Sequence, residues 1–417
     1  MAFATSSPSM DRRSVSLLSA GHFCIDICQG AVPALLPFLI AERHFSYAVA
    51  ASLVLATSLA SSVIQPLFGS LADRFAAPWL MPTGLIVAGL GLTGAGLAVD
   101  FWQIVVCMII SGIGVATFHP EAARWVNLVA SQKRATGMSI FSLGGNLGFA
   151  AGPLLTTSLL LVFGLPGTVF LLVPLGIVSL LLVLSFPRFL SYYKPRSREA
   201  KKAIPAGTDA WGAFSLLTVA VICRSIVFYG INTFLPLYWI AVFHQSKSVS
   251  SLALTILLLT GAIGTIISGR VADRYGRRIV VLVGFALLAP IILAFVTLGS
   301  ANMLLAFVLL LPLGLGLFLP ASVMIVMGQE YLPSFVGTAS GVTLGLAVSV
   351  GGIVTPFFGH IADLYGVHAA LVGLIFVALL AVAVSLALPK KRALPEDPIQ
   401  SDTPAEKASG ATRSASE

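Results

Sequence analysis

Ionisable and amide side chains interrupt the long apolar stretches of this chain at a few positions where they could do chemistry. His22, Asp26 and Gln29 occur at i, i+4 and i+7, so a helix would carry them on one stripe. A carboxylate in such a stripe can accept and release a proton. We therefore predict Asp26 as a proton-coupling group, with His22 and Gln29 beside it as groups that bind a solute.

A second polar group follows around Pro120, which should kink any helix that contains it. Glu121 and Arg124 are at i, i+3 and can pair on one helix face. We predict Glu121 as a second proton-coupling group, and His119 and Arg124 as ligands of an anion. The alternative is a kinked helix end with a local salt bridge. His119-Pro-Glu121 is also half of a zinc deaminase signature, but no Pro-Cys-x-x-Cys exists, so we expect no metal and no cofactor.

Three further polar side chains interrupt apolar stretches. The chain consists of two similar halves, described below, and Arg224 lies in the helix of the second half that is equivalent to the helix of Asp26. The two residues lie at comparable distances from the starts of these helices, so they could face each other across a cavity. We predict Arg224 as an anion ligand. The alternatives are a fixed ion pair between the halves, or separate hydrogen-bonded groups. Asn146 and Asn232 are candidates for binding the solute, or equally for joining helices by hydrogen bonds.

The elements that carry these residues must lie in lipid. The chain has 417 residues, of which 57% are hydrophobic and only 10% are charged. Soluble domains carry about 25% charged residues, so this chain cannot cover a globular surface with polar groups. Apolar stretches long enough to cross a bilayer are 14–40, 45–72, 80–98, 102–128, 137–163, 167–186, 212–241, 248–269, 279–299, 301–328, 337–361 and 366–388.

These stretches predict an all-α membrane protein of twelve transmembrane helices in two pseudo-symmetric bundles. Its predicted parts are a cytoplasmic N-terminus (1–13), a six-helix bundle (14–186), a basic cytoplasmic linker (187–210), a second six-helix bundle (211–388) and a disordered cytoplasmic tail (389–417). Features recur at a nearly constant offset: Gly30 and Pro37 match Gly230 and Pro236.

The basic residues orient the chain. Placing both termini in the cytoplasm leaves 21 of the 24 Lys and Arg residues on that side, with Arg43 and Lys247 outside and Arg224 within the membrane. This distribution accounts for the formal charge of +8, so we expect no nucleic-acid partner. The expected partners are protons, lipid and a small, anionic solute, and we expect a monomer.

A short loop pattern repeats between the halves and is specific enough to suggest a family. Gly69-Ser-Leu-Ala-Asp-Arg74 is matched by Gly269-Arg-Val-Ala-Asp-Arg274, and the second copy continues to Arg277 and Arg278. With the six-plus-six layout, this resembles the major facilitator superfamily. The resemblance implies rocker-type transport with the site between the halves. We expect Asp73, Arg74, Asp273, Arg274 and Arg277 to gate the cytoplasmic ends.

Three strings resemble the fosmidomycin-resistance group within that superfamily: Gly21–Gly30, Phe118–Ala122 and Thr136–Gly148. The resemblance implies proton-coupled export of a small toxic compound by antiport, with a phosphonate antibiotic as the type substrate, in the bacterial inner membrane. The alternative is a symporter that imports a small anionic metabolite. An enzyme or receptor would need a catalytic set, a metal cage or a large soluble domain, and the sequence has none, so we expect no enzyme.

Overall fold

The protein is a bundle of long helices. The computed structural model describes residues 10–74, 77–192, 208–299 and 302–389. Eleven helices in this part are long and apolar enough to cross a membrane. The last of them, α13 (Ala347–Ala387), is broken at Gly366, whose φ of 83° and ψ of 159° are not helical. Counting its two arms separately gives the twelve crossings that the sequence predicts.

The first half of the chain forms one group of helices. They are α1 (Arg12–Arg43), α2 (Tyr47–Arg74), α3 (Leu80–Leu97), α4 (Phe101–Val129), α5 (Arg134–Phe163), α6 (Leu172–Leu184) and the short α7 (Phe186–Tyr192). Helix α1 packs along α5, and α4 packs on α2 and α3. Here α1 and α5 touch backbone to backbone: a Cβ on Gly148 would lie 2.0 Å from the carbonyl oxygen of Phe23. We call this group the N-terminal bundle.

The second half repeats the arrangement. Its helices are α8 (Trp211–Ala241), α9 (Lys247–Tyr275), α10 (Arg277–Thr297), α11 (Met303–Tyr331), α12 (Val336–Gly341) and α13. A π-helical turn, Val342–Leu346, joins α12 to α13. Helix α8 packs along α13, and α11 packs on α9 and α10. We call this group the C-terminal bundle, and most of its buried apolar side chains form one cluster.

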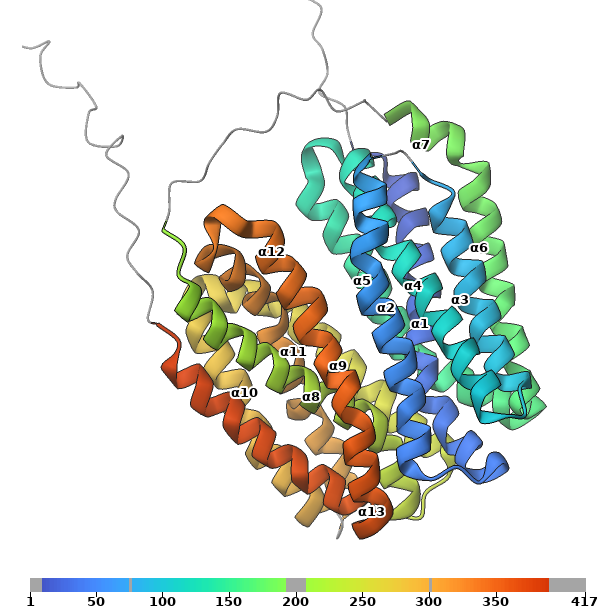
Figure 1. Cartoon of the computed structure of the whole chain (residues 1–417), viewed down its shortest axis with the longest axis vertical. Helices are drawn as coiled ribbons and strands as arrows, with labels where there is room; N and C mark the ends of the chain where they lie inside the picture. Colours follow the sequence, from blue (N-terminus) through green and yellow to red (C-terminus); the bar gives the residue numbers. More distant parts are fainter. Residues whose placement is uncertain (1–9, 75–76, 193–207, 300–301, 390–417) are drawn as a thin grey trace, which may run out of the picture.

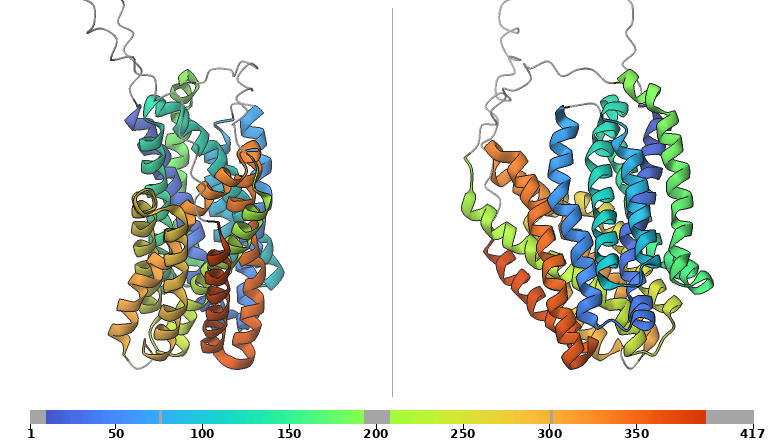
Figure 2. Two further views of the ribbon diagram at one scale, coloured as in Figure 1. Left: turned by 90° about the vertical axis from the view of Figure 1, so that its left-hand side faces the viewer. Right: turned by 45° about the vertical axis from the view of Figure 1, so that its right-hand side comes forward.

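The two bundles meet mainly through two helix pairs, α2 with α13 and α5 with α9. They lie close together at the end that carries the α1–α2 and α8–α9 loops, and they diverge toward the end that carries α7 and α12 (Figures 1 and 2). Lys247 lies over the ring of Phe38 at the close end, and the hydroxyls of Thr157 and Ser251 are hydrogen-bonded between α5 and α9. The close end therefore holds the bundles together in this state.

The predicted ends and linker fall partly outside the described residues. Residues 1–9, most of the linker (193–207) and the tail from residue 390 are among those the structure does not describe. The start of the predicted linker is the helix α7. Asp11 caps the N-terminus of α1 and also accepts two hydrogen bonds from Arg188 of α7, each 2.6 Å long. This contact anchors α7 to the first helix.

Candidate functional site

A cavity of about 240 Å³ lies between the two bundles. Its lining comes from both bundles, with α1, α2, α4 and α5 on one side and α8 and α11 on the other. The polar side chains that line it are Asp26, Gln29, Thr57, Ser58, Ser61, Asn146, Tyr229, Asn232 and Thr233. A cavity bordered by both halves, with a buried acid in its wall, is where a transported solute could be held.

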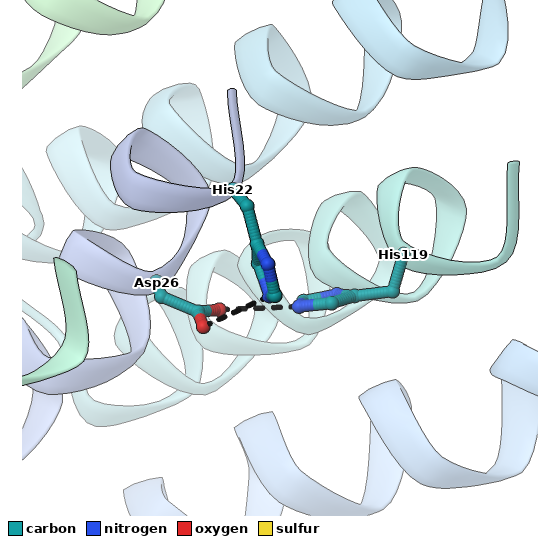
Figure 3. A group of neighbouring side chains, drawn as sticks. All are labelled: His22, Asp26 and His119. Carbon is teal, nitrogen blue, oxygen red and sulfur yellow. Dashed lines mark hydrogen bonds and ion pairs between the residues drawn. The ribbon is translucent and has the colours of Figure 1, made fainter. Parts of the chain in front are cut away.

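Asp26 is the centre of a hydrogen-bonded cluster (Figure 3). Its Oδ2 is 3.2 Å from Nε2 of His22, one turn earlier on α1, and its Oδ1 is 3.1 Å from Nε2 of His119 on α4. Gln29 donates a 2.6 Å hydrogen bond to Oδ1. The structure thus brings together four residues that the sequence places in two separate motifs. The exposed fraction of Asp26 is only 8%.

The other nitrogen of each imidazole determines where the protons are. Nδ1 of His22 is 2.8 Å from the carbonyl oxygen of Phe141, and Nδ1 of His119 is 2.9 Å from that of Val115. A carbonyl can only accept, so each Nδ1 must donate and a neutral ring would present a lone pair at Nε2. A lone pair facing a carboxylate oxygen is repulsive. A proton in each contact with Asp26 would remove that repulsion, so the geometry suits a cluster that shares protons.

Local packing fixes the position of these rings. The His22 ring stacks on Phe141, with 4.0 Å between the ring centroids. Gly145 of α5 leaves room for the cluster: a Cβ there would lie 2.4 Å from Nε2 of His22 and 2.7 Å from Oδ2 of Asp26. Its neighbours are the cluster itself.

The same three side chains have the donor types of a divalent metal site. One ligand atom from each of His22, Asp26 and His119 lies within 4.8 Å of the others. Zinc bonds of about 2.0–2.2 Å would place tetrahedral ligands about 3.4 Å apart. The two contacts of Asp26 with the imidazoles, at 3.2 and 3.1 Å, are of hydrogen-bond length.

Arg224 lies in α8 and is partly buried. Its Nε donates to the carbonyl oxygen of Leu317 at 2.9 Å, and its guanidinium lies 5.6 Å from the ring centroid of Phe228. Among the described side chains no carboxylate lies within ion-pair distance of it, so the fixed pair with Asp26 is not formed. Arg224 does not itself line the cavity but borders it through Phe228, which does. A guanidinium without an acidic partner in this position suits an anion.

The two asparagines both line the cavity. Nδ2 of Asn232 donates to the carbonyl oxygen of Phe228 at 2.8 Å, while its Oδ1 is buried and has no hydrogen-bond partner. An unpaired buried acceptor is costly unless a solute or water donates to it. Asn146 faces the same space from α5. Both residues thus face the cavity, with Asn232 also bonded within its own helix, and their role in binding a solute stays a prediction.

Glu121 and Arg124 lie apart from the cavity. Glu121 is fully buried, and its Oε1 accepts from the indole of Trp125 at 2.7 Å and from the backbone N–H of Ala77 at 3.1 Å. Arg124 lies 3.5 Å from Oε2. These contacts tie α4 to the segment before α3 within the N-terminal bundle, and they correspond to the local salt bridge given above as the alternative. The role of Glu121 in proton coupling stays a prediction.

The predicted gating residues are at the divergent end. Asp273 and Arg274 are exposed at the end of α9, and Arg274 lies over the ring of Tyr275. Arg277 pairs with Glu330 of α11, inside the C-terminal bundle. The side chains of Asp73 and Arg74 lie outside the described residues. A gating contact between the bundles at this end is therefore a prediction for another state.

Sequence reasoning missed the aromatic part of the cavity wall. Phe149 of α5 stacks on Phe228 of α8, with 6.1 Å between the ring centroids, and Phe318 of α11 meets Phe228 edge to face at 5.5 Å. All three line the cavity, as does Tyr229. Phenylalanines are frequent in lipid-facing stretches as well, so no pattern in the sequence distinguishes these four.

Comparisons with known proteins agree with this arrangement. The chain is 31% identical over 381 residues to the uncharacterized MFS-type transporter YfnC of Bacillus subtilis (strain 168), covering 90% of this chain and 92% of that one. It is 28% identical over 371 residues to the fosmidomycin resistance protein of Escherichia coli (strain K12), covering 87% and 90%. A crystal structure of a bacterial homolog of the human lysosomal transporter Spinster, in an inward-facing and occupied conformation, superposes with a TM-score of 0.76 at 16% identity, covering 92% and 97%.

The family model described as the Major Facilitator Superfamily matches residues 18–356. Together with the two six-helix bundles, this match confirms the fold class predicted from the repeated halves. The chain is a multi-pass membrane protein and belongs to the major facilitator superfamily.

Proposed function

We propose that this protein is a proton-coupled antiporter that exports a small toxic anion, such as a phosphonate drug, from the bacterial cytoplasm. The observation that carries the proposal is the contact of Asp26 with His22 and His119 in the wall of a cavity between two bundles. The likeness to a fosmidomycin resistance protein supports the substrate class. The positive-inside distribution supports an inner-membrane orientation with both termini in the cytoplasm. We propose that the protein acts as a monomer.

In this proposal the substrate enters from the divergent, cytoplasmic end. Its anionic group binds near Arg224, and the amides of Asn146 and Asn232 bind its other polar groups. A hydrogen-bond donor on the substrate takes the place of one proton at Asp26. Antiport needs this competition, because a proton and a substrate that bind together would travel together. The bundles then rock, the substrate leaves, and outside protons return to Asp26 and the two histidines.

A symporter that imports an anion is the second candidate, and the charge of the cluster favours it in one respect. With both protons bound, two imidazolium groups and one carboxylate carry a net charge of +1, which would attract an anion rather than repel it. A plain anion without a donor for Asp26 would then bind together with the protons. The two functions differ in the direction in which substrate moves protons.

Inverted membrane vesicles test the proposal. The vesicles are acidified by respiration, and fosmidomycin is added as the probe substrate. Antiport predicts that the drug releases protons from the lumen and accumulates inside. Membranes without the protein and membranes with Asp26→Asn are the controls. Proton movement in the same direction as the solute would support symport, and no drug-dependent proton movement with any phosphonate would contradict both.

A further inference from the structure

The loop signature occurs a third time, at the opposite end of the C-terminal bundle. Gly359-His-Ile-Ala-Asp-Leu-Tyr-Gly366 matches Gly269-Arg-Val-Ala-Asp-Arg-Tyr-Gly276 at five positions with one constant offset. The shared residues are both outer glycines, the alanine, the aspartate and the tyrosine. The first copies end α2 and α9 at the divergent end of the molecule, whereas the third is at the close end, where α13 breaks (Figure 1).

The last glycine of each C-terminal copy has the same backbone conformation. Gly276 has φ 92° and ψ 142°, and Gly366 has φ 83° and ψ 159°. Residues other than glycine rarely adopt such φ values. The pattern therefore specifies the same local structure twice: an aspartate in the last turn of a helix that ends abruptly at glycine.

Asp363 crosses from one bundle to the other. Its Oδ1 accepts a 2.7 Å hydrogen bond from the backbone N–H of Tyr47, and its Oδ2 accepts a 3.0 Å bond from that of Ala48. These are the first two residues of α2, in the N-terminal bundle. The next backbone N–H, that of Val49, donates a hydrogen bond to Oγ of Ser46. A helix N-terminus has unpaired N–H groups and a partial positive charge, so a carboxylate there is favourable on both counts.

A glycine one turn away lets the two backbones meet. A Cβ on Gly359 would lie 2.6 Å from Cα and 2.9 Å from the nitrogen of Ala48. Gly359 and Asp363 are at i and i+4, so they share one face of α13. The glycine provides the close approach and the aspartate provides the hydrogen bonds. Both features of the signature thus serve one contact between the bundles.

We propose that Asp363 is a gating residue, which holds the outer end of the transporter closed in this state and releases α2 when the outer end opens. Asp363 is exposed and Tyr47 and Ala48 are half-buried, so water can replace the lost hydrogen bonds when the bundles separate. The contact is therefore strong enough to bias the two states and weak enough to break in each cycle. This role rests on the alternating-access function proposed above.

The test measures the two states directly, without substrate. Spin labels at Val162 on α5 and Leu304 on α11, both exposed and at the close end, report the distance between the bundles in the full chain in nanodiscs, after the native cysteines are replaced by alanine. Asp363→Ala should raise the ratio of outward-open to inward-open molecules about tenfold, the effect of losing an N-terminal cap of typical strength. Asp363→Asn keeps one acceptor but no charge, and should give a smaller shift in the same direction.

The matched control is Asp100→Ala. Asp100 is an exposed aspartate at the same end and occupies the N-cap of α4, but it lies within the bundle that it caps. It should lower thermal stability without changing the distance distribution. The proposal is overturned if neither Asp363 variant changes the distribution, or if Asp100→Ala shifts it equally. Since no substrate is involved, failure of the proposed antiport would leave this readout intact.

Discussion

Single side chains decide which chemistry this cavity supports. The buried acid is not paired with Arg224 but is shared between two imidazoles whose remaining nitrogens are bonded to backbone carbonyls. This separates the proposed proton-binding group, in the N-terminal bundle, from a cation, in the C-terminal bundle. If a substrate contacts both groups, its affinity depends on the protonation of the Asp26 cluster in one bundle and on Arg224 in the other.

Removing the cation should weaken substrate binding without abolishing proton binding. We expect Arg224→Ala to raise the apparent KM for an anionic substrate by about 10- to 100-fold, the range for losing a charge-assisted contact. Arg224→Lys should recover part of the affinity, because it keeps the charge but not the planar fork. Transport assays in vesicles measure both. Arg134→Ala, an exposed cation at a helix end, is the control, and an unchanged KM for Arg224→Ala would contradict the role.

At the scale of helices, glycines and a helix cap position the Asp26 cluster. Helices α1 and α5 touch through glycines, and Gly145 in particular faces His22 and Asp26. At the beginning of α1, the cap Asp11 is bonded to Arg188 and to the hydroxyl of Tyr192. The helix that carries Asp26 is thus fixed both along its length and at its start.

A methyl group at position 145 should disturb the cluster. We expect Gly145→Ala to destabilise the fold by about 1–3 kcal/mol, as overpacking does, and to reduce proton-driven transport more than it reduces protein in the membrane. Gly176→Ala in α6 is the matched control, since a Cβ there meets nothing within 4 Å. Thermal unfolding and vesicle transport measure the two effects. If Gly145→Ala and Gly176→Ala had the same stability and the same transport activity, Gly145 would have no specific role at the Asp26 cluster.

The cap of α1 should give a defined pH dependence of stability. Burial opposes ionisation of Asp11, but hydrogen bonds from Arg188 and Ser14 outweigh it and lower the pKa of that carboxyl below its usual value. A depressed pKa stabilises the folded state above the unfolded pKa, and this stabilisation is lost as the pH falls through the folded pKa. We expect Asp11→Asn to cost about 1 kcal/mol at pH 7 and almost nothing once the pH is below the folded pKa of Asp11.

Thermal unfolding of wild type and Asp11→Asn at several pH values measures this difference. The control is Asp209→Asn: Asp209 is a half-buried aspartate near the start of α8, and its Oδ1 accepts a 3.0 Å hydrogen bond from the backbone N–H of Ser334. If the difference in stability between wild type and Asp11→Asn grew as the pH fell, the lowered pKa of Asp11 would be contradicted.

At the scale of the whole molecule, the sequence predicts the architecture well and the site only in part. Hydropathy and the repeated halves locate all twelve crossings because each crossing is a local property of about twenty residues. Asp26, His22 and Gln29 share one helix, so their proximity also follows from spacing. The contact of Asp26 with His119 does not, because it depends on how α1 packs against α4. The aromatic wall and the contact of Asp363 with α2 depend on packing between bundles, which no local pattern encodes.

The central claim is that protons on the Asp26 cluster drive substrate movement between the two halves. The most direct test compares two modes of transport for Asp26→Asn in proteoliposomes: exchange of labelled for unlabelled fosmidomycin without a gradient, and accumulation driven by a pH gradient. Exchange needs only binding and rocking of the bundles, whereas accumulation needs a group that titrates. The account predicts that Asp26→Asn keeps exchange and loses accumulation. Accumulation at the wild-type level in Asp26→Asn would contradict it.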